Sequence, residues 1–117
     1  MDRSRREHLN TPIIQDVISL NNILIGINTK AFKVIGRNYL DSILKQGALL
    51  FNYAMRQLRG LDYYKRAVEL TCEIQYSIYF ISSIGGCNIQ KASEVDVICD
   101  KILSALSKIK SVRNEKS

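Results

Sequence analysis

Few residues of this 117-residue chain could carry out acid–base or metal chemistry. His8 is the only histidine and lies in a charged amino-terminal arm, so we expect no catalytic pair built on histidine. Glu69 and Glu73 lie four residues apart on one face of a predicted helix and could in principle share a metal ion. Carboxylate di-metal bundles need Glu-x-x-His elements, however, and the sequence contains none. We therefore predict a protein that is not an enzyme, with no catalytic residue, metal site or cofactor.

The three cysteines, Cys72, Cys87 and Cys99, are widely spaced and form no Cys-x-x-Cys pair. This pattern indicates neither a zinc site nor a disulfide framework. The charged amino terminus is not followed by an apolar run of the signal-peptide type. The most apolar segment, Ile13–Ile27, is interrupted by polar residues and is too short to span a bilayer. We expect a cytoplasmic protein that does not enter a membrane.

The placement of positive charge is a stronger signal. The chain carries 17 lysines and arginines against 11 acidic residues, a net charge of +6. Two clusters are expected at opposite ends of a helical hairpin: Lys30, Lys33 and Arg37 in one, and Arg56, Arg59, Lys65 and Arg66 in the other, which we call the basic tip. Long basic side chains at helix ends can reach phosphate groups, so both clusters are candidates for nucleic-acid binding. The alternative is a set of solvated helix ends that bind nothing.

Hydrophobic periodicity and helix-ending residues predict four helices that position these side chains. The predicted starts are Thr11-Pro12, Asn38, Asp62 and Ser93, each with a side chain suited to capping. Gly60 predicts the end of the second helix, and Gly85-Gly86 the end of the third. Helices joined by such short connections must be antiparallel. The sequence thus predicts an all-α, antiparallel up-down-up-down four-helix bundle over residues 11–113, with a flexible arm at 1–10 and a frayed tail at 114–117.

Each predicted helix carries an apolar stripe at three- and four-residue steps. The stripe of the first helix is Ile13, Val17, Leu20, Leu24 and Ile27, widened by Ile14, Ile18 and Ile25. That of the second is Tyr39, Ile43, Gly47, Leu50, Ala54 and Leu58, and that of the third is Tyr64, Ala67, Thr71, Ile74, Ile78 and Ile81. Glycine at position 47 costs about 1 kcal/mol of helix propensity relative to alanine. We therefore expect a neighbouring helix to approach closely there.

The third helix also has a second face about half a turn from its stripe. This outer face comprises Glu69, Glu73, Tyr76, Tyr79 and Phe80. A helix that is apolar on more than one side usually has neighbours on more than one side. We therefore predict that the outer face is an interface in a homo-oligomer, in which a glutamate could meet a basic residue of the next subunit.

Spacing patterns along most of the chain resemble a known four-helix-bundle family. They are Tyr39-Leu40, Ile43, Gly47 and Phe51, then Tyr64, Ala67 and Glu73, then Ile78-Tyr79-Phe80-Ile81 before Gly85-Gly86, and finally Val95 to Ile109. The family includes proteins encoded in 23S ribosomal RNA intervening sequences and the accessory variability determinant of diversity-generating retroelements. The resemblance implies no catalysis. The retroelement members form barrel-shaped homopentamers that bind a reverse transcriptase and nucleic acid and support mutagenic complementary-DNA synthesis.

Two classes of function are consistent with these observations. The first is a non-enzymatic, pentameric accessory that binds a reverse transcriptase and RNA or an RNA–DNA intermediate. The second is an interaction or regulatory bundle that binds only protein. The basic residues do not match a family motif one by one, so the resemblance implies a basic surface and assigns no role to an individual residue. It does not indicate to which branch of the family the chain would belong.

Overall fold

The computed structural model describes residues 8–27 and 36–116 of the chain, and the side chains of residues 8–27 and 36–109. Four long helices make up most of this part: α2 (Pro12–Gly26), α4 (Arg37–Leu58), α5 (Tyr64–Ser83) and α6 (Ile89–Lys116). Among the described helices, none is long and apolar enough to cross a membrane.

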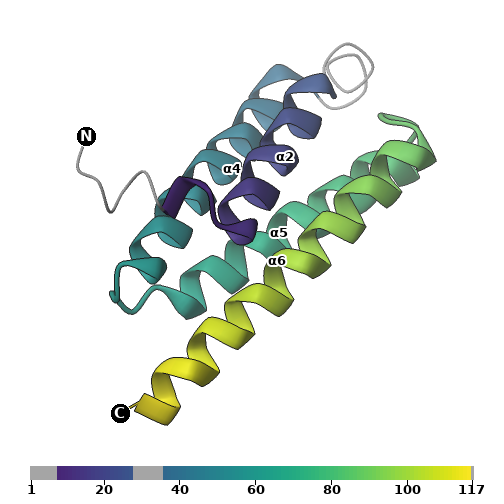
Figure 1. Ribbon diagram of the computed structural model, residues 1–117. Coiled ribbons are helices and arrows are strands. Elements are labelled where there is room, and N and C mark those ends of the chain that lie inside the picture. The colour runs from purple at the N-terminus through teal and green to yellow at the C-terminus, as the bar shows by residue number, and fades with distance from the viewer. Residues whose placement is uncertain (1–7, 28–35, 117) are drawn as a thin grey trace.

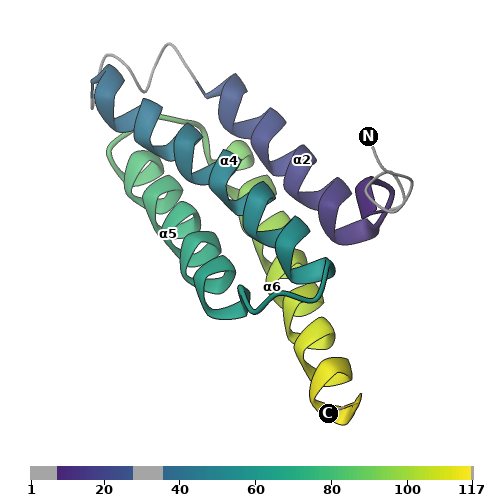
Figure 2. The ribbon, with the colours of Figure 1, turned by 90° about the vertical axis from the view of Figure 1, so that its left-hand side faces the viewer.

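The four helices pack side by side in a bundle whose longest dimension is 48 Å (Figure 1). α2 packs against α4 and α6, and α5 packs against the same two helices. Successive helices run in opposite directions (Figure 2), as the short connections at 59–63 and 84–88 require. The predicted all-α, antiparallel four-helix bundle is therefore confirmed. α6 is the longest helix, and its carboxyl-terminal end extends past the other three (Figures 1 and 2).

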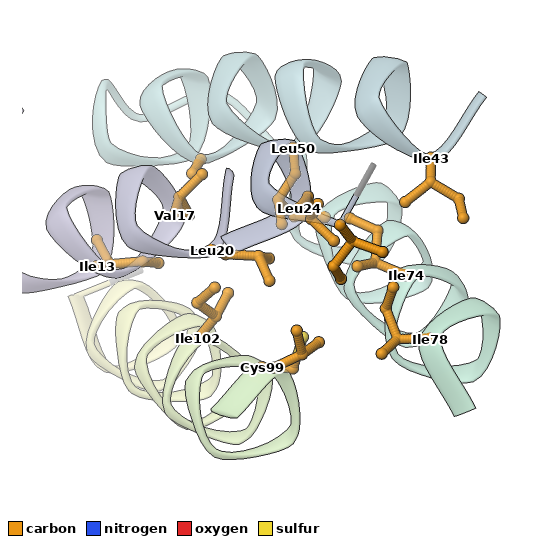
Figure 3. Close-up of a cluster of buried hydrophobic side chains, with 14 of the residues drawn as sticks. Ile13, Val17, Leu20, Leu24, Ile43, Leu50, Ile74, Ile78, Cys99 and Ile102 are labelled. Carbon is orange, nitrogen blue, oxygen red and sulfur yellow. The ribbon is translucent and has the colours of Figure 1, made fainter. Parts of the chain in front are cut away.

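The core lies between the helices and receives aliphatic side chains from all four of them (Figure 3). Its members include Ile13, Val17, Leu20 and Leu24 of α2, Ile43 and Leu50 of α4, Ile74 and Ile78 of α5, and Cys99 and Ile102 of α6. Removing one large aliphatic side chain from water stabilises the fold by about 1.5–3 kcal/mol. The predicted main stripe of the first helix is confirmed, and that of the third is confirmed except that Tyr64 is only partly buried.

The predicted stripe of α4 is wrong at both ends. Tyr39 is 37% exposed and Leu58 is only partly buried, whereas Leu40 and Gln57 are buried. The buried positions follow alternating steps of three and four residues, which keep to one side of a 3.6-residue helix, whereas consecutive four-residue steps drift around it. On α2, Ile25 is 62% exposed, so the predicted second row does not reach that far.

The close approach predicted at Gly47 is confirmed. A Cβ atom at this position would overlap Oδ1 of Asn21 on α2 and would lie 3.3 Å from Cδ1 of Leu24. The absence of a side chain therefore lets α2 and α4 come together at this point.

Two helices end in the same glycine-dependent way. After α4, the amide of Gly60 donates to the carbonyl of Gln57 and that of Leu61 donates to the carbonyl of Arg56. After α5, the amides of Gly85 and Gly86 donate to the carbonyls of Ser82 and Ile81. Both are Schellman motifs, and they require the positive φ of 96° at Gly60 and 79° at Gly85. The two predicted helix ends are confirmed.

Three predicted helix starts are wrong. Asn38 lies within the first turn of α4, whose N-cap is Gly36, and the N-cap of α5 is Tyr63 rather than Asp62. α6 begins four residues before Ser93, because the Asn88 side chain accepts a hydrogen bond of 2.7 Å from the amide of Lys91. A capping side chain near the start of an apolar stripe does not fix the start when an earlier residue already satisfies the free amides.

The first helix begins at Pro12, as predicted, but the side chain of Thr11 does not cap it. The Thr11 hydroxyl instead donates to the carbonyl of His8 at 2.7 Å. Leu9, within the predicted arm, is helical and packs against the core. At the other end, α6 continues as helix to Lys116, through most of the tail that was expected to fray.

Candidate nucleic-acid interface

The first predicted basic cluster is represented in the structure by Arg37 alone, because Lys30 and Lys33 lie outside the described residues. Arg37 is the first residue of α4 and is exposed. It therefore lies at the end of the bundle opposite the basic tip, as the antiparallel hairpin of α4 and α5 requires (Figure 2).

The connection between α4 and α5 brings the four residues of the basic tip together. Arg56 is in the last turn of α4 and Arg59 is its C-cap, while Lys65 and Arg66 are in the first turn of α5. All four are exposed. Within the described part of the chain none of them forms a salt bridge, although Asp62 lies in the same connection. Positive charge at the carboxyl end of α4 also suits the helix dipole.

Tyr63 holds two of these guanidinium groups. Nη1 of Arg56 donates a hydrogen bond of 2.7 Å to the Tyr63 hydroxyl, and Cζ of Arg56 lies 5.1 Å from the ring centroid. Cζ of Arg66 lies 5.8 Å from the same centroid, and the ring of Tyr53 packs against it at 5.1 Å. Cation–π attraction of about 0.5–1 kcal/mol at an exposed site offsets the repulsion between two like charges held close together.

Sequence reasoning predicted the four cations of the basic tip. It missed Tyr53, which lies on α4 ten residues before Tyr63. The turn at Gly60 brings the end of α4 beside Tyr63, but whether Tyr53 faces Tyr63 depends on the rotation of α4, so no local signal marks Tyr53.

A hollow of about 290 Å³ adjoins the basic tip on the surface of α4. It is lined by Phe51, Asn52, Met55, Arg56 and Arg59, which share one side of the helix. A second hollow of about 340 Å³, between α2 and α4, has Phe51 in its wall as well, together with Ile18, Asn21, Asn22 and Ala48. Sequence reasoning assigned no binding role to Phe51, so both hollows were missed.

The outer face of α5 is exposed. Tyr76 is 67% exposed, and Tyr79 and Phe80 are each 49% exposed. Tyr39 of α4 extends this surface, because its ring meets that of Phe80 edge to face at 6.0 Å. Glu69 and Glu73 are exposed as well.

Hydrogen bonds tie the outer face to the helices on either side. Gln46 of α4 donates to Glu73 at 3.0 Å. On the other side, the Tyr79 hydroxyl donates to Asp96 of α6, and Gln75 donates to Asp96 at 2.7 Å and to Asp100 at 3.1 Å. The hydrogen bond to Asp96 and the nearby negative charges raise the pKa of Tyr79.

The cysteines are free thiols with different surroundings. Cys99 is fully buried, and burial, with the charges of Asp96 and Asp100, raises its pKa to about 12. Cys87 is partly buried, which also raises its pKa. Over the residues that the structure describes, no group of three or more histidine, cysteine or acidic side chains could hold a metal ion.

A scan against protein-family models and searches of curated proteins and of solved structures found no match to this chain. The family resemblance therefore rests on the spacing patterns in the sequence alone.

Proposed function

We propose that this protein is a non-enzymatic, self-associating bundle that binds nucleic acid through the basic tip. The observation that carries the proposal is the tip itself, where four exposed cations from two helix ends lie together and form no salt bridge among the described residues. Such a surface suits phosphate groups, whose binding releases condensed counterions and is insensitive to sequence. The preferred ligand is structured RNA or an RNA–DNA intermediate.

Self-association through the outer face of α5 would repeat the basic tip around a ring. A ring presents several tips on a common surface, so that one nucleic acid meets many phosphate contacts at once. The resemblance to the retroelement proteins favours a pentamer and a reverse transcriptase as the protein partner. A gene for a reverse transcriptase beside the gene for this protein would support that assignment.

The experiment reverses two charges of the tip. Binding of a labelled RNA hairpin is followed by fluorescence anisotropy between 50 and 200 mM salt. About six phosphate contacts would lower the affinity roughly a thousandfold over this range. Arg56→Glu with Arg59→Glu should weaken binding to every sequence alike, while circular dichroism and the assembly mass stay unchanged. Lys45→Glu with Lys91→Glu is the matched control, since Lys45 precedes Arg56 by eleven residues on α4 and Lys91 is in the first turn of α6, at the other end of the bundle.

A protein-only interaction bundle is the second candidate. It is favoured by the contacts that Arg56 and Arg66 already make with Tyr63. These contacts engage two of the four guanidinium and ammonium groups of the tip within the protein itself. If the reversals leave the affinity unchanged, or if binding does not respond to salt, the basic tip is a solvated surface and the second candidate takes its place.

A further inference from the structure

Phe51 separates two hollows on the outside of the bundle. It forms part of the wall of the hollow beside the basic tip and part of the wall of the hollow between α2 and α4. Its side chain is partly buried against the core, which fixes its position. The distance along α4 from Phe51 to Arg59 is about 12 Å, since eight residues each rise 1.5 Å. The two hollows and the guanidinium groups therefore follow one another along α4, and we call this row of sites the track.

Each hollow combines an apolar wall with a side-chain amide. Met55 and Asn52 line the first, and Ile18 and Asn22 line the second. Asn52 and Asn22 are exposed, and within the described residues neither amide has a hydrogen-bond partner. By contrast, Asn21 already donates to the carbonyls of Val17 and Gly47. The free amides can therefore donate to and accept from a ligand.

Arginine completes the chemistry at one end of the track. Arg56 uses one of its five N–H donors on Tyr63, and Arg59 makes no salt bridge with any described residue. An aromatic wall, amides that can meet a base edge and guanidinium groups that can meet phosphate are the parts by which proteins hold unpaired nucleotides. A fatty or purely apolar ligand would leave the amides and the cations without partners.

We propose that the track holds a short unpaired stretch of nucleic acid, with a base in each hollow on either side of Phe51 and a backbone phosphate at Arg56 and Arg59. This inference rests on the proposed function and narrows it from nucleic acid in general to unpaired segments such as loops and single-stranded ends. Bases within a duplex are stacked and paired, so they cannot enter the hollows, although their phosphates can still meet the basic tip.

The test compares two labelled probes of one sequence, a single-stranded octanucleotide and the same strand in a blunt duplex, by fluorescence anisotropy at fixed salt. Phe51→Leu keeps an apolar side chain of somewhat smaller volume against the core and removes the aromatic wall. It should weaken binding of the single strand at least about fivefold, the lower end of the cost of losing one stacking side chain, and leave the duplex unchanged. Asn52→Ala should act in the same direction.

Two control variants make the same chemical changes elsewhere. Phe80→Leu alters the outer face of α5, and Asn38→Ala alters an exposed amide at the other end of α4. Both should leave the ratio of single-strand to duplex affinity unchanged, because any loss of assembly in Phe80→Leu lowers both affinities alike. Equal binding of single strand and duplex, or equal loss for both probes in Phe51→Leu, overturns the inference and leaves the proposed function standing. Binding of neither probe at low salt overturns both.

Discussion

The side-chain amide of Asn21 on α2 donates a hydrogen bond of 3.1 Å to the carbonyl of Gly47 on α4, and a second one of 2.9 Å to the carbonyl of Val17. Its oxygen occupies the space that a Cβ atom at position 47 would need. Asn21 and Gly47 thus form one unit, in which the Asn21 side chain fills the space that the glycine leaves free. This unit holds α2 and α4 in close contact at that point.

Gly47→Ala should destabilise the protein by about 1 kcal/mol. The new methyl group displaces the Asn21 amide and costs its hydrogen bonds, and this loss exceeds the gain of about 1 kcal/mol in helix propensity. In an Asn21→Ala background the same substitution should become neutral or stabilising, because the overlap is gone. Urea unfolding of the four variants measures the coupling. Gly26→Ala is the control, since a methyl group there meets nothing within 4 Å. If the effects of Gly47→Ala and Asn21→Ala on the free energy of unfolding simply add, the two residues are not coupled.

The close approach at Gly47 could be predicted because a glycine on a buried helical stripe is costly unless something replaces its side chain. The glycine-dependent ends of α4 and α5 could be predicted for a related reason, since only glycine readily adopts the positive φ that these ends require. The partner of Gly47 could not be predicted. Asn21 was counted only as a polar interruption of the first helix, and nothing local in the sequence shows which residue of one helix faces which residue of another.

The features of the candidate interface that the sequence did not predict were missed for the same reason. The four cations of the basic tip follow from charge and from the turn at Gly60, both of which are local. The contact between Tyr53 and Tyr63 and the two hollows beside Phe51 depend on how α4 is rotated about its axis. The sequence-based stripe included Tyr39 in place of Leu40, and the predicted rotation of α4 was therefore wrong. An amphipathic tyrosine fits a buried stripe and an exposed face equally well.

Gln57 is a buried polar residue that connects α4 to the turn. It is 2% exposed, and its side-chain oxygen accepts a hydrogen bond of 2.8 Å from the amide of Tyr63, the N-cap of α5. Gln57→Ala should destabilise the protein by about 1–2 kcal/mol, because the Tyr63 amide loses its shorter hydrogen bond and keeps only the one of 3.2 Å to the carbonyl of Leu61. Thermal unfolding followed by circular dichroism measures the change. Gln90→Ala, at an exposed position of α6, should change stability by less than about 0.5 kcal/mol. Equal effects would show that the buried hydrogen bond is unimportant.

The hydrogen bond from Tyr79 to Asp96 should make stability depend on pH in the alkaline range. The pKa of Tyr79 is raised above the ordinary value of about 10 in the folded protein. The stabilisation is therefore fully present below about pH 10 and is lost as the pH rises through the raised pKa. Urea unfolding between pH 7 and pH 11 should show that Tyr79→Phe is less stable than the unmodified protein at pH 7, with a difference that shrinks at high pH. Tyr76→Phe, without a bond to Asp96, is the control. A difference that persists unchanged at pH 11 would contradict the assignment.

Assembly through the outer face of α5 is the last prediction. Tyr76 is 67% exposed and Tyr79 and Phe80 are each 49% exposed, and Tyr39 joins them through its contact with Phe80. Exposed aromatic side chains held in place by neighbouring helices are typical anchors of protein interfaces. Tyr76→Glu with Phe80→Glu places two more carboxylates beside Glu69 and Glu73. If both anchors are buried between subunits, association should weaken by roughly 30-fold or more, while the helix content stays the same.

Light scattering coupled to size exclusion measures the assembly over a range of protein concentrations. The matched control is Ser19→Glu with Ser107→Glu, which adds the same charge at exposed positions of α2 and α6. Because the net charge changes equally in both pairs, a loss of assembly confined to the first pair assigns the interface to the outer face. If both pairs of substitutions abolish assembly, the cause is the change in net charge, since repulsion between subunits then opposes association wherever the carboxylates lie. A monomeric mass for the unmodified protein at every concentration would remove the ring from the proposed function and leave each basic tip to bind nucleic acid alone.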